Sequence, residues 1–211
     1  IVGAITRTDI LRTLYEDVLR RSRLQALPSQ EKPSMGRNLA HWIKERFPAP
    51  VSAMLRLAGE VAEGLGYSAY LVGGSVRDLL RGQENLDIDV VIEGDGIHFA
   101  REFGRRIDAK VRAHERFGTA QVFSDVLKID VASARTEYYE SPAALPKVEM
   151  SSIKKDLYRR DFTINAMAVK LNPGSFGDLI DFYGGKKDLD EGVIRVLHNF
   201  SFVEDPTRIF R

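Results

Sequence analysis

A strand pattern that runs directly into a Gly-Gly-Ser turn and then a helix is the feature that most constrains this chain. Residues 67–72 are apolar enough for a strand, and Gly73, Gly74 and Ser75 separate them from the next helical pattern. Such a turn presents backbone N–H groups and a helix N-terminus, which together favour a phosphate group. Glycine lets the backbone approach that ligand closely, and Arg77 would add a charged donor. A Gly-Gly turn alone is weak evidence, because most such turns bind nothing.

Two aspartates at alternate positions of the next predicted strand extend this pattern. Asp87 and Asp89 lie in the strand pattern of residues 86–93, and alternate strand residues point to the same face. Adjacent carboxylates repel unless a cation lies between them, and magnesium takes oxygen ligands that it shares with phosphates. Asp130, in the strand pattern of residues 126–133, would complete a three-carboxylate site if the two strands are neighbours. Two metal ions there would activate a 3′-hydroxyl and stabilise a leaving pyrophosphate. Solvent-facing or structural strand acids are the alternative.

Two downstream segments carry paired acids and arginines. Residues 158–167 place two arginines and an aspartate just before a strand pattern. Asp205, Arg208 and Arg211 follow at helical spacing, on one broad face. An aspartate and an arginine together supply acceptors and donors that suit the edge of a nucleobase. A salt-bridged helix is the alternative for either segment taken alone.

The composition is that of an ordinary globular chain with no strong overall charge. The 211 residues have a formal net charge of +1 and contain no cysteine, which excludes disulfides, thiolate zinc sites and a cysteine nucleophile. No apolar run approaches the roughly 20 residues of a membrane span, and no signal segment opens the chain. These features fit a cytoplasmic protein. The basic clusters at 20–23, 101–112 and 154–160 are either nucleic-acid contacts or solvated helix faces.

Helical and strand patterns alternate along the chain, which predicts an α/β (α+β) fold. Helical patterns cover residues 38–47, 51–62, 76–80, 97–107 and 153–159, and a further helix begins at Val203. Strand patterns cover residues 67–72, 86–93, 110–114, 119–123, 126–133, 166–171 and 179–182. Residues 137–150 are polar with two prolines, and the pattern predicts a loop there.

Five ordered motifs resemble the bacterial class II tRNA nucleotidyltransferase and poly(A) polymerase family, within the DNA polymerase beta nucleotidyltransferase superfamily. The motifs are Gly-Gly-x-x-Arg-Asp, Asp-x-Asp, Arg-Arg-Asp-Phe-Thr-Ile-Asn-Ala, Asp-Phe-Tyr-Gly-Gly and Glu-Asp-Pro-x-Arg, spread over residues 65–211. The resemblance implies a nucleotidyltransferase head, a five-stranded mixed sheet flanked by helices, followed by the start of a helical neck. It also implies ATP or CTP as substrates and two magnesium ions as cofactors.

The same resemblance assigns roles to individual residues. It implies that Gly74 and Arg77 contact the triphosphate and that Asp87 and Asp89 bind magnesium. Arg160 would contact the nucleotide, and Asp161 would lie at the hinge between head and neck. Asp205 and Arg208 would read the Watson–Crick edge of the base, assisted by Arg211. Selection of ATP or CTP would then rest on protein side chains and not on a nucleic-acid template.

The expected domain organisation follows from these assignments. Residues 1–24 resemble the C-terminal remnant of a CBS module, 25–50 are a linker with a short helix, 51–198 form the head and 199–211 begin the neck. The chain is expected to be a piece of a longer protein, whose missing domains would grip the tRNA 3′ end. Sequence alone leaves a homodimer open.

Three functions are compatible with this sequence. The first is template-independent addition of AMP or CMP to the tRNA 3′ end, as a CCA-, CC- or A-adding enzyme or a poly(A) polymerase; the CBS-like segment favours an A-adding or poly(A)-type member. The second is an adenine-nucleotide sensor without turnover, which would not need the carboxylate pair. The third is a nucleotidyltransferase acting on a small molecule or protein, for which the segment at residues 204–211 is not expected.

Overall fold

A computed structural model describes residues 38–138, 147–199 and 201–211 of the chain, and the side chains of residues 136–150 and 204 lie outside the description. The CBS-like segment at residues 1–24 and most of the predicted linker therefore fall outside the described residues. In the described part, each helix is too short or too polar to span a membrane.

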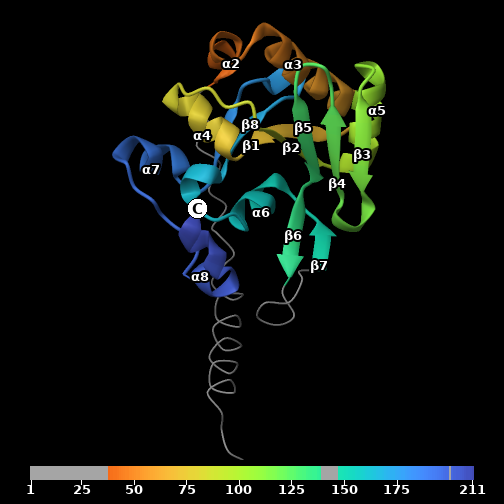
Figure 1. The fold of residues 1–211 in the computed structure, drawn as a ribbon. Helices are drawn as coiled ribbons and strands as arrows, with labels where there is room; N and C mark the ends of the chain where they lie inside the picture. The colour runs from red at the N-terminus through yellow and green to blue at the C-terminus, as the bar shows by residue number, and fades with distance from the viewer. Residues whose placement is uncertain (1–37, 139–146, 200) are drawn as a thin grey trace, which may run out of the picture. The chain divides into compact units, whose positions relative to one another are not determined.

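A mixed seven-stranded sheet forms the centre of the described chain (Figure 1). Its strands are β1 (Ser68–Val72), β2 (Ile88–Glu93), β3 (Lys110–His114), β4 (Thr119–Phe123), β5 (Lys128–Ser133), β8 (Met167–Lys170) and β9 (Leu179–Asp181), in the order β3-β4-β5-β2-β1-β8-β9. The β2–β5 pair is parallel and the others are antiparallel. The predicted mixed α/β class is confirmed. The expected five strands are wrong: all seven strand patterns pair their backbone groups within this sheet.

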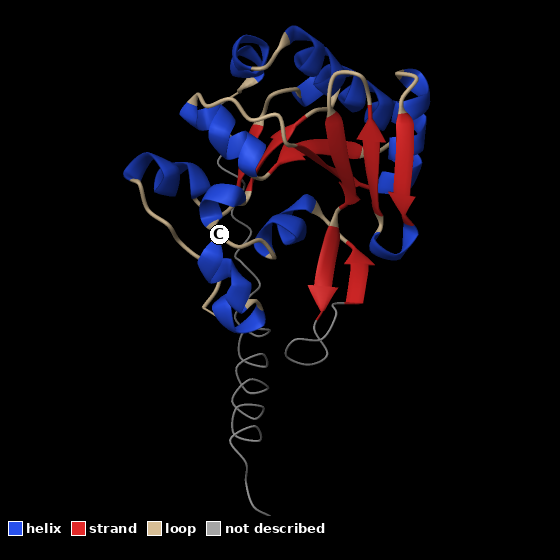
Figure 2. Ribbon diagram, viewed as in Figure 1, coloured by secondary structure: helices blue, strands red, loops and turns tan. Residues whose placement is uncertain are grey.

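Four helices share one apolar core with the first face of the sheet (Figures 1 and 2). They are α2 (Ala40–Arg46), α3 (Ala49–Gly64), α4 (Gly74–Arg81) and α5 (Gly96–Arg106). On the second face, a smaller cluster joins β1, β2 and β8 to α6 (Ile153–Tyr158). α7 (Gly185–Glu191) follows β9 and contacts the short helix η2 (Thr163–Asn165). The two faces are therefore covered to different extents, and the second face receives helices mainly at β1, β2 and β8.

The segment predicted as a loop at residues 137–150 is instead partly a hairpin. β6 (Arg135–Tyr138) continues the direction of β5 and pairs antiparallel with β7 (Lys147–Met150), outside the main sheet (Figure 1). The polar composition misled the prediction, because a two-stranded ribbon needs no buried apolar face along its length. Residues 139–146 lie outside the described part.

The C-terminal segment is broken where a continuous helix from Val203 was predicted. α8 (Ser201–Glu204) ends before Asp205, and a 3₁₀ helix, η4 (Pro206–Phe210), follows. Proline has no N–H and disfavours the α conformation in the residue before it. Asp205 accordingly adopts φ −140° and ψ 91°, and its carboxylate accepts the Thr207 N–H at 3.0 Å. The break turns Asp205 from a helical residue into the N-cap of the next element.

Close backbone packing joins α3 to the sheet at Gly59. A Cβ atom built at Gly59 would lie 1.8 Å from the carbonyl oxygen of Leu171. Asn172 completes the junction, because its side chain accepts the Ala69 N–H at 2.9 Å and donates to the Tyr67 carbonyl at 2.9 Å. The start of β1, and hence the turn that follows it, is positioned by this contact.

Gly59→Ala is expected to lower the free energy of unfolding of the chain by at least about 3 kcal/mol, because the methyl group meets backbone that cannot move aside cheaply. Gly64→Ala, at the end of the same helix with open space around it, is the matched control and is expected to be neutral or stabilising by up to about 1 kcal/mol. Urea unfolding measures both. Equal stability of the two variants would contradict the packing.

Candidate functional site

The turn between β1 and α4 brings two distant motifs to the same point. Gly73 has φ +76° and ψ −140°, and it caps α4 without any side-chain hydrogen bond. A Cβ atom at Gly73 would lie 3.1 Å from Nη1 of Arg160 and 3.6 Å from Oδ2 of Asp89. Glycine is therefore required both by the backbone angle and by the close approach of these side chains. The open N-terminus of α4 faces the same place as the arginine and the carboxylate.

Ser75 contributes to this turn in another way than expected. Its hydroxyl donates to the Val72 carbonyl at 3.0 Å, and the side chain is buried. It lines none of the cavities described below, so the side chain holds the turn together. The predicted contact of the Gly73-Gly74-Ser75 backbone with a phosphate group does not involve this hydroxyl and stays a prediction.

The acids of the site come from adjacent strands. Asp89 on β2 lies directly opposite Asp130 on β5 in the parallel register, which confirms that the two strands are neighbours. Asp87 is exposed and precedes β2, which begins at Ile88, so it is not on the strand as predicted. Its N–H donates to the Asn85 side chain at 2.9 Å.

The pKa of Asp89 is raised to about 6, chiefly by burial and also by the charges of Asp87 and Asp130, while the charge of Arg160 lowers it. A carboxylate in this setting is stabilised by a cation. No three histidine, aspartate or glutamate side chains of the described residues are arranged to hold a metal ion by themselves. Two carboxylates that share an ion with phosphate oxygens are, however, the usual environment of magnesium, and the donor set fits that ion.

A buried carboxylate orients the arginines of the third motif. Asp156 on α6 is fully buried, and it accepts from Nη2 of Arg159 at 2.8 Å and from Nη2 of Arg160 at 3.3 Å. Nε of Arg160 is buried and, among the described atoms, has no hydrogen-bond partner. Arg160 is thus anchored on one side by Asp156 and reaches Gly73 on the other.

Arginines of the C-terminal segment contact this same region. Arg208 is buried, and it donates to Oγ of Ser201 at 2.7 Å and to the Arg159 carbonyl at 3.2 Å. Arg211 donates to Asp205 at 3.0 Å and lies 3.6 Å from a carboxylate oxygen of Asp161. A 3₁₀ helix repeats every three residues, so positions 205, 208 and 211 align despite the break in the predicted helix.

These residues meet around one cavity of about 400 Å³. It is lined by Gly73, Gly74, Arg77, Asp89, Arg159, Arg160, Asp161, Asn165, Asp205, Arg208 and Arg211. Every residue predicted to bind the nucleotide lines it except Ser75. Asp130 lines a neighbouring cavity, and neither cavity is lined by Asp87.

Several residues that position this cavity were not predicted as site residues. Asn165 accepts from Nη1 of Arg77 at 2.8 Å and donates to Asp161 at 3.0 Å, which links two motifs. Asn85 donates to Asp78 at 2.7 Å, and Asp78 in turn pairs with Arg77. The pattern of residue types indicated a structured loop around Asn165, but only the fold shows which partners these amides bind.

Comparisons with known proteins agree with this geometry. Residues 69–195 match the model of the poly A polymerase head domain. The chain belongs to that family. It is 55% identical over 213 residues to the A-adding tRNA nucleotidyltransferase of Geobacter sulfurreducens; the alignment covers 100% of this chain and 24% of the relative. The chain therefore spans about a quarter of the length of that relative.

Solved structures share the fold. A Thermotoga maritima CCA-adding enzyme complexed with tRNA is 49% identical with a TM-score of 0.74, over 83% of this chain and 39% of that one. A CCA-adding enzyme complexed with CTP and one complexed with ATP are each 50% identical over 83% of this chain, with TM-scores of 0.74 and 0.73, and 39% and 40% of those chains are covered. The family fold therefore extends over most of the described residues.

Asp89→Asn is expected to stabilise the chain in the absence of metal and nucleotide by about 1–2 kcal/mol at pH 7.5. The folded state disfavours the ionised carboxylate, because its pKa is raised to about 6. The gain should shrink as the pH falls from 6 toward 4, where the wild-type carboxyl takes up its proton in the folded state. Urea unfolding in the presence of a chelator measures it.

Asp125→Asn, an exposed acid in the β4–β5 turn, is the control and should change the stability by less than about 0.5 kcal/mol. If Asp89→Asn lowers the stability at pH 7.5, the carboxylate is not under the electrostatic strain described here.

Proposed function

We propose that the chain is the catalytic head of an enzyme that adds nucleotides to the 3′ end of tRNA without a template, taking AMP or CMP from ATP or CTP. The observation that carries the proposal is the 400 Å³ cavity in which the glycine turn, an acid and the arginine motifs meet. Membership of the poly A polymerase head family supports it, as do relatives named for A addition and for CCA addition. Poly(A) synthesis uses the same chemistry.

The triphosphate would lie against the N-terminus of α4. No side chain caps the N-terminus of α4, so the backbone N–H groups of Gly73 and Gly74 are open to a ligand there. The helix dipole favours a negative charge at the same place. Arg77 and Arg160 line the same cavity and would donate to phosphate oxygens. Asp156 holds the Arg160 guanidinium in place before the ligand arrives, so little side-chain entropy is lost on binding.

Asp87 and Asp89 would hold magnesium, with Asp130 as the third acid of the catalytic group. Bound magnesium would supply Lewis acidity, which lowers the pKa of the acceptor 3′-hydroxyl and neutralises charge on the phosphates. Asp89 lines both neighbouring cavities. It would therefore lie beside both substrates as the acceptor 3′-oxygen loses its proton and bonds to the α-phosphorus, while the bond from that phosphorus to the pyrophosphate leaving group breaks.

The base would be read by Asp205 and Arg208, with Arg211 assisting and Asp161 at the hinge. In this structure Asp205 pairs with Arg211 and Thr207, while Arg208 is held by Ser201 and a backbone carbonyl. When a base binds, hydrogen bonds to its Watson–Crick edge would replace some of these contacts. The relative named as A-adding favours ATP as the substrate of this chain.

The remaining assignments belong to this proposal. Residues 51–198 would be the head and 199–211 the start of the neck, after a linker and a CBS-like segment. A cytoplasmic location and the binding of tRNA through further domains go with the same function, and a homodimer stays open. A nucleotide sensor is the competing function, and it differs by binding ATP without turnover.

The proposal is tested by incubating the full gene product with magnesium and four tRNAs, which lack the terminal CCA or end in C, CC or CCA. AMP from labelled ATP should be transferred to the tRNA that ends in CC, and the product should be longer by one nucleotide. Incorporation of CTP as well would make the protein a CCA-adding enzyme within the same proposal. ATP binding with no incorporation on any of these tRNAs would refute the proposal and support the sensor.

Asp205→Ala is expected to reduce the preference of the full gene product for ATP over CTP by at least about tenfold, since a base-edge hydrogen bond discriminates by roughly 1–3 kcal/mol. Triphosphate affinity should fall by less than about threefold, because its contacts lie at α4. Kinetics with each nucleotide measure both. Asp190→Ala, an exposed acid on α7, is the control. Unchanged selectivity in Asp205→Ala would remove the base-reading role.

A further inference from the structure

The short helix α6 carries the carboxylate that orients the arginines of the third motif, so its place on the sheet decides where these arginines lie. The helix has six residues, Ile153–Tyr158, and a helix of this length is not stable by itself. Ile153 and Leu157 pack into the apolar cluster of the second face. Apolar packing is not directional. It therefore determines which side of α6 faces the sheet but not how far along the strands the helix lies.

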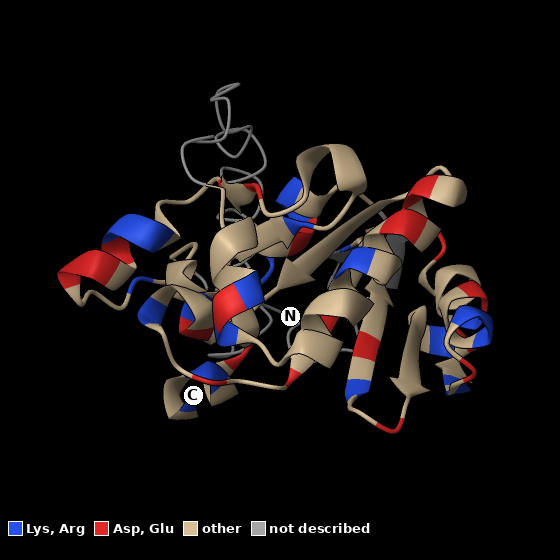
Figure 3. Ribbon diagram, turned by 90° about the horizontal axis from the view of Figure 1, so that it is seen from above, with Lys and Arg blue, Asp and Glu red and all other residues tan. Residues whose placement is uncertain are grey.

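A carboxylate of β2 holds the N-terminus of α6. Acidic residues occur on helices and strands alike (Figure 3), but this one accepts hydrogen bonds from two other elements. Oε1 of Glu93 accepts the Ile153 N–H at 2.7 Å, and Oε2 accepts the Tyr70 hydroxyl at 2.9 Å. Ser152, at the usual capping position, makes no capping hydrogen bond through its side chain in the described structure. Because hydrogen bonds are directional, Glu93 fixes where α6 begins along β2.

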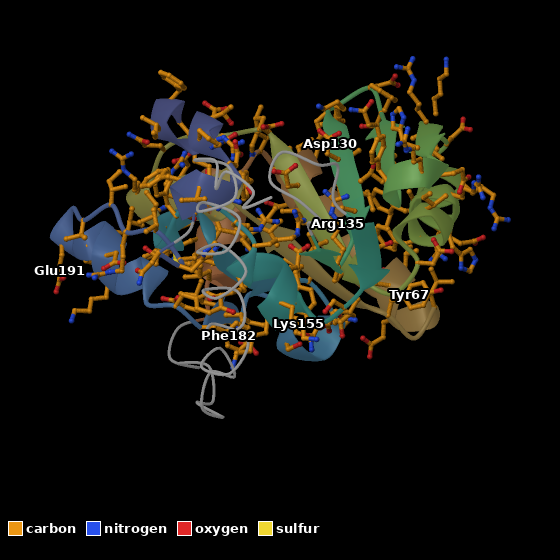
Figure 4. The ribbon with its side chains drawn as sticks, turned by 90° about the horizontal axis from the view of Figure 1, so that it is seen from below. Tyr67, Asp130, Arg135, Lys155, Phe182 and Glu191 are labelled. Atoms are coloured by element: carbon orange, nitrogen blue, oxygen red, sulfur yellow. The ribbon has the colours of Figure 1, made fainter. Side chains whose placement is uncertain are left out.

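Two tyrosines support this end of α6. Tyr70 is buried on β1, and burial together with the charge of Glu93 raises the pKa of its hydroxyl, which stays protonated and remains a donor. The hydroxyl of Tyr183, in the Asp-Phe-Tyr-Gly-Gly motif, donates to the Lys154 carbonyl at 2.7 Å. The next residue, Lys155, is exposed on α6 (Figure 4). The first turn of α6 is therefore bound through its backbone on the side that faces the protein.

The strand that anchors α6 also carries an acid of the candidate site. Asp89 and Glu93 are four residues apart on β2 and point to the same face, at a separation of about 13 Å in an extended strand. From the C-terminal part of α6, Asp156 binds Arg160 at 3.3 Å, and the Arg160 guanidinium returns to the glycine turn beside Asp89. Strand and helix thus form a closed loop. A shift of the start of α6 along β2 would move Arg160 relative to Asp89.

We propose that Glu93, held by Tyr70, is a positioning residue for the nucleotide: through α6 and Asp156 it fixes the Arg160 guanidinium at the triphosphate. The inference rests on the proposed function, because it takes a triphosphate to be the ligand of Arg160. Glu93 is not among the described residues that line the cavity of about 400 Å³. It therefore acts on the nucleotide only through Arg160.

The test measures by calorimetry how tightly the full gene product binds ATP with magnesium, in the absence of an RNA acceptor. Glu93→Ala removes both acceptor oxygens and is expected to weaken ATP binding by about tenfold, because a displaced guanidinium no longer meets the phosphates in the right geometry. Glu93→Gln keeps an oxygen for the Ile153 N–H and an amide for the Tyr70 hydroxyl, so its ATP affinity should stay within about threefold of the wild type. Glu60→Ala, at an exposed position of α3, is the control and should bind ATP as the wild type does.

A double-mutant cycle with Arg160→Ala separates positioning from a general defect. If Glu93 acts through Arg160, Glu93→Ala should weaken ATP binding by less than about twofold in a protein that already carries Arg160→Ala. A general defect would weaken ATP binding by the same factor in both backgrounds. Urea unfolding of each variant shows that the folded state is populated during the titration.

Tyr70→Phe tests the same contact by the loss of a single hydroxyl, and it replaces Glu93→Ala in the cycle if that variant does not fold. The Glu93 carboxylate then has one donor fewer, and ATP binding is expected to weaken by about threefold. Tyr67→Phe is the matched control, because its hydroxyl lies 3.4 Å from Nδ1 of His98 and apart from α6 (Figure 4). ATP affinity should not change in this control.

Three results overturn the inference. Wild-type ATP affinity in Glu93→Ala and Tyr70→Phe, while Arg160→Ala binds weakly, would exclude the role of Glu93 and leave the proposed function standing. Wild-type ATP affinity in Arg160→Ala would remove the triphosphate contact of the proposed function and this inference with it. Equal losses from Glu93→Ala with and without Arg160 would assign Glu93 to the fold and not to the position of this arginine.

Discussion

The electrostatic balance around Asp89 governs the organisation of the site. This carboxylate is partly buried and faces two other acids, and these surroundings raise its pKa to about 6. Arg160 provides the compensating charge, and it reaches this position because Asp156 holds it from α6 and because Gly73 has no side chain to block it. The glycine turn, the strand acids and the arginine motif are far apart in the sequence, and they therefore meet at this one carboxylate. The arrangement costs folding stability, as is common at functional sites.

The same carboxylate lies where two cavities meet and lines both of them. One cavity is bounded by the N-terminus of α4 and the arginines, which suit a triphosphate, and the other by the strands β3, β4 and β5. Parallel pairing of β2 with β5 places the acids at the boundary. In the described part of the chain, the apolar cluster of the second face takes no residue from β3, β4 or β5, so helices cover this face unevenly.

Much of this site could be predicted from residue types and spacing. The turn at Gly73 and all seven strand patterns follow local rules of periodicity and turn formation. The pairing of the Asp89 strand with the Asp130 strand was only a condition of the three-carboxylate site, and the fold supplies it. Prediction failed where the outcome depended on long-range partners or on one residue. Pro206 broke an expected helix, and a polar segment predicted as a loop formed a hairpin beyond β5. Nor does spacing reveal that Asn165 binds Arg77, since 88 positions separate the two residues. Asp156, by contrast, precedes Arg159 and Arg160 by three and four residues, a helical spacing from which both pairs could have been predicted.

The proposed function requires a triphosphate against the glycine turn and a metal ion at Asp89, where the two cavities meet. Crystals grown with Mn²⁺ and a non-hydrolysable ATP analogue test it most directly, because the anomalous signal of manganese locates the ion independently of the refined coordinates. We predict an ion bound by Asp87 and Asp89, with the triphosphate against Gly73 and Gly74 and within reach of Arg160. A triphosphate placed over β3 and β4, or an ion bound away from Asp89, would contradict the account.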